Sequence, residues 1–127
     1  MTTTLSPFQT NGLKKLTTIK ARVHPDYYRN NTSLQANLLS ELTQIICEHQ
    51  LADSDYSTLP EHRTRFKTDE DWLNQFTVGG ICKYFTYLIW TETVMAGNLA
   101  KRVEDSSVYL LVVRLEALLS TPIQSYQ

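Results

Sequence analysis

The stretch Thr77–Gly97, TVGGICKYFTYLIWTETVMAG, decides the fold class of this chain, because its apolar residues recur at the spacing of an α-helix. At about 100° per residue, one side of that helix collects apolar residues and, near its middle, Glu92. These apolar residues are Val78, Ile81, Phe85, Leu88, Ile89 and Met95. Trp90 falls on the opposite side, with Lys83, Thr86 and Thr93. The pattern predicts a long helix whose one acid faces the core.

A second apolar segment, VYLLVVRLEALL over residues 108–119, is hydrophobic on every side, and such a helix is expected at the centre of a domain. Its only cation is Arg114. A buried acid and a buried arginine each need a partner, since an unpaired charge away from water is costly. We therefore predict that Glu92 and Arg114 form a structural ion pair between the two most apolar helices.

Capping and turn residues predict the other boundaries. Ser6 and Pro7 suit the start of a first helix, which we expect Gly12 to interrupt before a basic amphipathic stretch that ends at His24-Pro25. The elements expected next are a loop over 25–31, a helix capped by Thr32 or Ser33 and running to about Gln50, a long, partly ordered loop over 51–67, helix starts at Thr68 and Thr77, a short helix over 98–104 and a turn over 105–107.

These elements predict one all-α domain over residues 1–127. We expect a compact bundle of five or six helices around 77–97 and 108–119, with residues 1–5 and 121–127 loose. A chain of 127 residues, 42% hydrophobic and 20% charged, is long enough to bury a sizeable core without metal or disulfide. Its first residues lack the order of a secretory signal, and its apolar runs are too short to span a membrane. We therefore expect a cytoplasmic protein without membrane contact, in which Cys47 and Cys82 are reduced and fill the core.

The charge is distributed unevenly along the chain. Residues 1–33 hold five Lys or Arg against one Asp, and residues 34–127 hold seven against twelve acids, so the two parts carry about +4 and −5. The favoured interpretation is that the two parts attract each other within the fold. The alternative is an auxiliary nucleic-acid-binding surface, with aromatic residues available to stack on bases. Its residues would be Lys14, Lys15, Lys20, Arg22, Tyr27, Tyr28 and Arg29.

Catalytic and metal-binding patterns are weak in this sequence. His24, His49 and His62 stand far apart, and no phosphate loop, nucleophile elbow or metal-ligand spacing occurs. A metal-dependent or acid–base enzyme that uses Glu92 or the acids of the 51–67 loop is therefore the least favoured function. We expect no cofactor, no metal and no catalytic residue.

The favoured function is a small protein-interaction module, such as a regulator, an immunity protein or a phage-type inhibitor. An exposed tryptophan is a common anchor at protein interfaces, and the long loop would add a second contact. The expected partner-binding residues are Trp90, Tyr87, Lys83 and Tyr56. A helix covered on both sides would instead bury Trp90 in the core, so its exposure stays open. A homodimer through the same face is also open.

The order of features from Tyr84 to Leu115 resembles a small bacterial domain family of uncharacterised function. In that family an arginine-containing aromatic helix ends in Gly, a short helix follows, and a hydrophobic helix closes with Arg-Leu. The matching residues are Tyr87, Glu92, Gly97, Leu99, Ala100, Arg114 and Leu115. This chain has Trp90 and Thr93 where the family places arginines. The resemblance therefore implies the helical layout and no activity.

Overall fold

The protein is all-helical. A computed structural model of the chain describes residues 5–120, and this part contains no strand. The elements in order are α1 Pro7–Thr18, α2 Pro25–Arg29, α3 Thr32–Glu48, the 3₁₀ helices η1 Tyr56–Thr58 and η2 Arg63–Arg65, α4 Asp69–Leu73, α5 Val78–Val94, α6 Asn98–Glu104 and α7 Ser107–Leu119. The expected all-α class is confirmed. The expectations for residues 1–4 and 121–127 lie outside the described residues.

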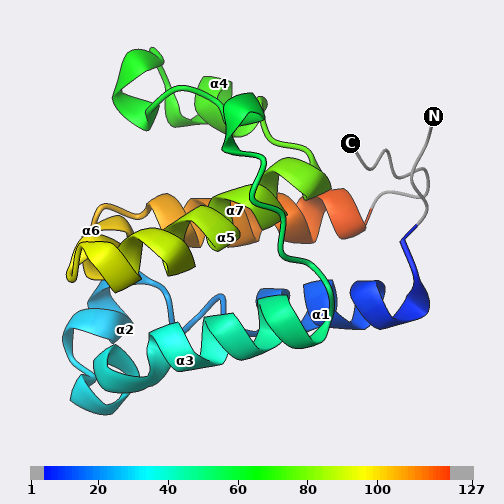
Figure 1. Cartoon of the computed structure of the whole chain (residues 1–127). Coiled ribbons are helices and arrows are strands. Elements are labelled where there is room, and N and C mark those ends of the chain that lie inside the picture. Colours follow the sequence, from blue (N-terminus) through cyan, green and yellow to red (C-terminus); the bar gives the residue numbers. More distant parts are fainter. Residues whose placement is uncertain (1–4, 121–127) are drawn as a thin grey trace.

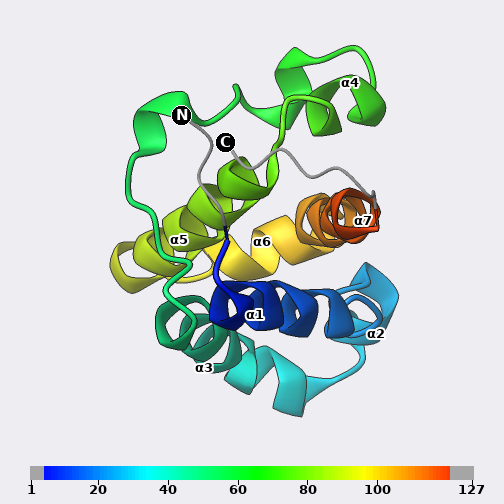
Figure 2. The same ribbon diagram turned by 90° about the vertical axis from the view of Figure 1, so that its right-hand side faces the viewer.

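The helices are arranged in layers (Figures 1 and 2). α1, α2 and α3 form one layer, and α5, α6 and α7 lie against it through contacts of α3 with α5, α1 with α7 and α2 with α6. α4 and the two 3₁₀ helices lie on the far side of the α5–α7 layer. The segment that leaves α3 must therefore cross α5 to reach α4, and it does so along one side of α5 (Figure 1).

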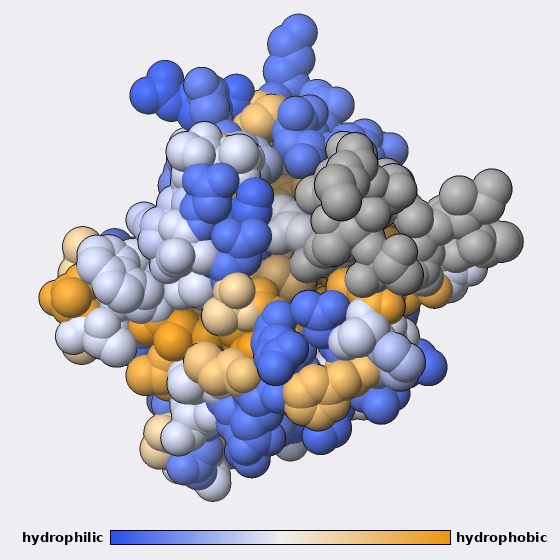
Figure 3. Space-filling model, turned by 45° about the vertical axis from the view of Figure 1, so that its right-hand side comes forward, coloured by the Kyte–Doolittle hydropathy of each residue, from blue (hydrophilic) through white to orange (hydrophobic). Residues whose placement is uncertain are grey.

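The core lies between these layers. Val108, Leu111, Val112 and Leu115 of α7 are fully buried, in agreement with the central position expected for this helix. Buried residues from α1, α3, α5 and α6 complete one hydrophobic cluster with them. At the surface, hydrophobic residues appear in a band across the middle of the molecule, with hydrophilic residues above and below (Figure 3). Burial of the apolar helix faces is the main force that joins the layers.

Several helix starts follow the capping residues expected from the sequence. Ser6 begins α1 with a capping box, in which its hydroxyl accepts from the Gln9 amide at 3.1 Å and the Gln9 side chain accepts from the Ser6 amide. The Thr68 hydroxyl likewise accepts from the Asp71 amide at the start of α4, and the Thr77 hydroxyl accepts from the Gly80 amide at the start of α5. α3 is capped by the Asn31 side chain rather than by Thr32 or Ser33. The error is one residue, which is usual for caps inferred from sequence.

Gly12 does not interrupt α1, so that expectation was wrong. The helix is continuous from Pro7 to Thr18, and Gly12 is buried against the end of α3. A Cβ atom at position 12 would lie 2.5 Å from Cβ of His49, closer than two carbon atoms can approach. Glycine is therefore required for close contact between α1 and α3, a reason that is invisible in the local sequence.

The region after α1 also differs from expectation. α1 ends at Thr18 rather than near His24, and residues 25–29, expected as a loop, form the short helix α2. The His24 side chain caps α2 by accepting from the Asp26 amide at 3.2 Å, and Pro25 occupies the first helical position. Tyr28 is consequently turned into the core.

Two further expectations concern the cysteines and membranes. Cys82 of α5 is buried as expected, whereas Cys47 is exposed on α3, so its assignment to the core was wrong. Cys47 directly follows Ile45 and Ile46, which both belong to the buried face of α3. No helix within residues 5–120 has the length and apolar character needed to cross a membrane.

Candidate interaction surface and adjoining cleft

The C-terminal end of α5 carries a group of exposed apolar side chains, here named the Trp90 face: Tyr87, Trp90, Val94 and Met95. Trp90 is 55% exposed, Val94 66% and Met95 64%. Tyr87, Trp90 and Val94 are spaced three and four residues apart, so they form one stripe along the helix. Met95 was expected on the core side of a helix ending at Gly97. It is exposed because α5 ends at Val94 and the backbone leaves the helical path at Met95.

The preceding part of α5 is covered by the segment that comes from α3. The Asp53 amide donates to the Thr86 hydroxyl at 3.1 Å, and the Lys83 ammonium donates to the Thr58 hydroxyl at 2.7 Å. The Tyr56 ring packs edge-on against Tyr87, with 5.4 Å between the ring centroids. The 51–67 segment is thus attached to α5, and its cover ends beside Tyr87.

The four residues expected to bind a partner therefore differ in their surroundings. Tyr56 and Tyr87 contact each other, and Lys83 is half-buried beneath Thr58. Trp90 lies beyond this covered part and is exposed. Val94, which lies four residues after Trp90 and was expected as its neighbour, and Met95 extend the surface. Met95 was not expected there, because the glycine at position 97 suggested a helix that continues past Val94.

Glu92 and Arg114 do not form the expected ion pair, so this prediction was wrong. The Glu92 carboxylate accepts hydrogen bonds from the Gly97 amide at 3.1 and 3.3 Å and from the Leu99 amide at 3.0 Å. Arg114 donates through Nε to the Phe76 carbonyl at 3.3 Å. Glu92 is half-buried and caps the first turn of α6, where a carboxylate suits the free amides and the positive end of the helix. Glu92 belongs to α5, but its carboxylate stabilises the turn after α5 and the start of α6.

Beside the Trp90 face, the chain encloses a cleft of about 380 Å³, here named the Arg102 cleft. It lies between the 56–63 segment and helices α4 to α7, and it shares Tyr87 with the Trp90 face. Its lining residues are Tyr56, Leu59, Pro60, Glu61, His62, Arg63, Trp72, Tyr84, Tyr87, Leu88, Asn98, Arg102 and Ser107. Aromatic side chains and two guanidinium groups therefore line one hollow. Residues from such distant positions cannot be grouped by sequence spacing.

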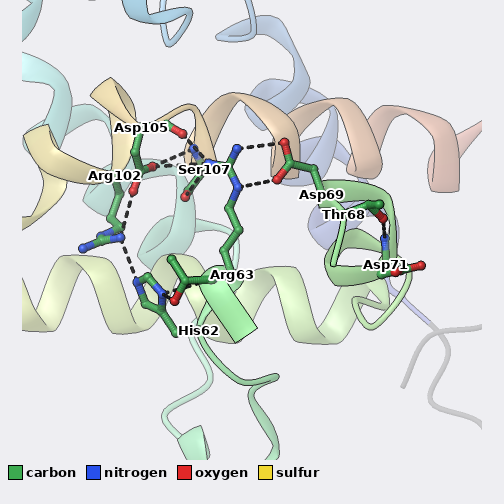
Figure 4. A network of polar contacts seen from close by, with 9 residues as sticks. His62, Arg63, Thr68, Asp69, Asp71, Arg102, Asp105 and Ser107 are labelled. Atoms are coloured by element: carbon green, nitrogen blue, oxygen red, sulfur yellow. Dashed lines mark hydrogen bonds and ion pairs between the residues drawn. The ribbon is translucent and has the colours of Figure 1, made fainter. Parts of the chain in front are cut away.

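A network of ion pairs closes one side of the cleft (Figure 4). Arg63 donates to both carboxylate oxygens of Asp69, at 2.7 and 2.8 Å, and to the backbone carbonyl of Asp105. The Asp69 carboxylate raises the pKa of Arg63, and the Arg63 guanidinium in turn holds the pKa of Asp69 below its usual value. This two-point contact attaches η2 to the start of α4, and the bond to Asp105 attaches it to the turn before α7.

Arg102 uses one of its terminal nitrogens in the same network. Nη1 donates to the Asp105 carboxylate at 2.8 Å and lies 3.1 Å from Nε2 of His62. Because a guanidinium can only donate, Nε2 must accept, and the imidazole proton is assigned to Nδ1, which donates to the Thr64 hydroxyl at 3.0 Å. The Thr64 amide also lies 3.4 Å from Nδ1, but that contact requires the other tautomer and is the longer one.

Tyr84 stands next to this network at the inner side of the cleft. Burial raises the pKa of its phenol to about 12, with smaller effects from Arg102, Asp105 and Ser107. The phenol consequently remains protonated at neutral pH, and its hydroxyl can both donate and accept a hydrogen bond. Trp72 packs edge-on against Tyr84 and Phe76, at 6.2 and 5.1 Å between centroids, which fixes the aromatic wall.

The basic residues of the N-terminal third are largely neutralised within the fold. Lys20 pairs with Glu116 at 2.9 Å, Arg22 donates to Glu41 at 2.7 Å, and Arg29 pairs with Asp26 at 3.3 Å. The first two pairs join positive residues of the 1–33 segment to acids of the remainder, as the favoured interpretation of the charge pattern expects. Lys14 and Lys15 are exposed and form no ion pair within residues 5–120.

The two tyrosines expected to stack on nucleic-acid bases differ in their exposure to solvent. Tyr28 is only 4% exposed, so its assignment as a stacking residue was wrong, whereas Tyr27 is 48% exposed. Tyr27 borders a shallow hollow of about 660 Å³ between α2 and α7, together with Lys20 and His24. The structure thus leaves Tyr27, Lys14 and Lys15 accessible but does not gather them on one short helix face.

Comparisons with known proteins add no assignment. No protein-family model, curated protein or solved structure matches the chain. Within the described residues there is also no group of three or more His, Cys, Asp or Glu side chains that could hold a metal ion. The functional argument therefore rests on the surface and the cleft described above.

Proposed function

We propose that this chain is a small non-enzymatic protein-interaction module, such as a regulator, an immunity protein or a phage-type inhibitor, that binds a partner protein through the Trp90 face. The observation that supports the proposal is the joint exposure of Trp90, Val94 and Met95 at one end of α5, all above half. Three large apolar side chains side by side in water are unfavourable unless another surface covers them. Tryptophan and tyrosine are the residue types that contribute most at protein interfaces.

The attachment of this face supports the same function. α5 spans seventeen residues, and its buried side contacts α3, α6 and α7, so the exposed stripe stands on a rigid element. A rigid surface loses little conformational entropy on binding. The 53–58 segment already packs on the first part of this helix side, and a partner would extend that cover towards Val94.

The test is affinity capture from lysate with the wild type and Trp90→Ala, each with and without nuclease. A protein partner that survives nuclease and binds at least about thirtyfold more weakly to Trp90→Ala is expected, since an anchor tryptophan typically contributes about 2 kcal/mol or more. Phe8→Ala is the matched control, because Phe8 is 49% exposed at the start of α1, away from α5. Capture that is unaffected by Trp90→Ala would contradict the proposal.

Two other outcomes separate the alternatives. A second copy of this chain is one possible partner, and sedimentation of the purified protein would then show a dimer that Trp90→Ala dissociates. If nuclease removes the captured material and a Lys14, Lys15 and Lys20 triple alanine variant prevents its capture, the auxiliary nucleic-acid function replaces the proposed one. That binding would be weak and steeply salt-dependent, because Lys20, Arg22 and Arg29 are held in ion pairs and only Lys14 and Lys15 of the expected set are left.

A further inference from the structure

The Arg102 cleft has the composition of a small-ligand site. Its volume of about 380 Å³ falls in the range of ligand pockets in proteins, roughly 300 to 1,000 Å³. Tyr56, Tyr84, Tyr87 and Trp72 provide flat aromatic walls, and Leu59, Pro60 and Leu88 add apolar surface. Polar groups enter from α6 and from η2. An apolar hollow with a few converging polar groups is the usual form of a binding site.

Arg102 is the polar group best placed to select a ligand. Its side chain is only 20% exposed, and its Nη1 is occupied by Asp105 and His62. These two contacts fix the plane of the guanidinium. Nε and Nη2 make no hydrogen bond within residues 5–120, and Figure 4 shows the second terminal nitrogen pointing away from the network. The remaining edge of an arginine presents two parallel N–H groups, which match the two oxygens of a carboxylate.

The neighbouring charges favour one negative charge over two. Arg63 and Arg102 are already balanced by Asp69 and Asp105, so the network is neutral before any ligand enters. A doubly charged phosphate would add two negative charges near Asp105 and the exposed Glu61, whereas a carboxylate adds one and meets less repulsion. A single carboxylate can use the open Arg102 edge, in a cleft that Tyr84 also lines. The site thus suits a monoanion with an apolar body.

We propose that the Arg102 cleft binds a carboxylate carried on an aromatic or similarly flat apolar group, with the carboxylate on the Nε and Nη2 edge of Arg102 and the flat group against Tyr56 and Tyr87. Such a ligand has two sources with the same chemistry: a free small aromatic acid, or the terminal carboxylate of a peptide that ends in an aromatic residue. This site adjoins the Trp90 face and shares Tyr87 with it, but its selection of a carboxylate rests on Arg102 and does not depend on the proposed function.

The experiment uses Trp72 as the reporter. The chain has two tryptophans, and Trp90→Phe leaves only Trp72, which lines the cleft. Its fluorescence is titrated with phenylacetate and with N-acetylphenylalanine, and in parallel with the neutral amides of both. We expect saturable binding of at least one acid with a dissociation constant of about 1 mM or lower, and at least about tenfold weaker binding of its amide. Tighter binding of N-acetylphenylalanine identifies a peptide terminus as the source, and tighter binding of phenylacetate identifies a free acid.

Two variants on the Trp90→Phe background test the role of the arginine. Arg102→Gln is expected to lower the affinity for the acid at least about tenfold. Lys101→Gln removes a neighbouring exposed cation and is expected to leave the affinity unchanged, which controls for general charge. Equal binding of acid and amide, or unchanged binding to Arg102→Gln, would overturn the proposal, and so would failure of both acids to bind at about 10 mM. The comparison of acid with amide needs no change at Arg102, so it remains decisive if Arg102→Gln disturbs the fold.

Discussion

The surroundings of the two ends of α5 differ, because one end packs against a buried tryptophan and the other carries an exposed one. Near its start, Trp72 of α4 is 2% exposed and packs edge-on against Phe76 and against Tyr84 of α5. Near its C-terminal end, Trp90 is 55% exposed on the helix itself. The difference arises from the covering segment, since residues 53–56 contact α5 at Thr86 and Tyr87 and Trp90 lies beyond these contacts. An aromatic side chain therefore belongs to the core near the start of α5 and to the surface near its C-terminal end.

The largest expected effect is at the covered end. Trp72→Ala should destabilise the protein by about 3 to 5 kcal/mol, because it removes a fully buried indole from an aromatic cluster and leaves a cavity. The measurement is urea denaturation followed by circular dichroism. Trp72→Phe keeps a ring in the site and should cost clearly less. Equal stability of Trp72→Ala and the wild type would show that the cover over α5 is loose.

The next largest effect on stability is expected at the turn between α5 and α6, next to the exposed end of α5. Glu92→Ala should cost about 1 to 2 kcal/mol, because it removes the acceptor for the Gly97 and Leu99 amides at the start of α6. A double-mutant cycle with Arg114→Met should be additive within about 0.5 kcal/mol, since the two side chains have different partners. Urea denaturation of the four proteins measures the cycle. A coupling of several kcal/mol would restore the ion pair expected from the sequence.

A smaller effect depends on pH and belongs to the covered end. The pKa of Asp69 is lowered by Arg63, so the folded protein holds this carboxylate charged at a pH where the unfolded chain, near 3.8, begins to protonate it. The pair therefore contributes stability above about pH 4, and that contribution is lost as the pH falls through the lower folded pKa. The contribution should be about 0.5 kcal/mol, because the Asp69 side chain is half exposed.

Thermal denaturation between about pH 5 and pH 2 measures this contribution. Asp69→Asn should lose less stability than the wild type across that interval. Asp71→Asn is the matched control, because Asp71 lies in the same first turn of α4 and forms no ion pair within residues 5–120. If Asp69→Asn and the wild type lose stability in parallel, the pair contributes nothing measurable to the cover of α5.

The smallest expected effect on stability is at Trp90. Trp90→Ala should change the free energy of unfolding by no more than about 0.5 kcal/mol, because most of the indole is already in water. Urea denaturation alongside Trp72→Ala checks this expectation directly. A loss of several kcal/mol would mean that Trp90 belongs to the core, and it would also remove the support for the proposed interaction surface.

Local sequence was sufficient for the helical class and for many helix starts. Ser6, Thr68 and Thr77 were recognised as caps because a capping bond joins residues only two or three positions apart. Most of the buried face of α5 followed from helical periodicity, which is also a local property, and the central place of α7 followed from its apolar residues on every side. The short α6 was expected with its observed bounds, because Gly97 and Asp105 mark both ends of an otherwise helical pattern.

Features that depend on distant contacts were not accessible in the same way. Gly12 was expected to break α1, yet it is the point where His49 approaches, thirty-seven positions away in the sequence. Glu92 and Arg114 were matched because both needed a partner, but backbone amides and a carbonyl were nearer than the opposite charge. Charge requirements predict that a partner exists and do not identify it.

The candidate sites divide along the same line. The sequence indicated Trp90, Tyr87 and Tyr56 as aromatic candidates, but whether Trp90 is in the core or in water depended on where the 53–73 segment ends on α5. The Arg102 cleft was not foreseen, because its lining comes from four α-helices and from the 56–63 segment. Helical periodicity and capping depend on residues a few positions apart, so the local sequence determines them. The burial of each side chain, and the grouping of Arg102 with Tyr84 and Tyr56, depend on the packing of the helix layers and arise only in the tertiary structure.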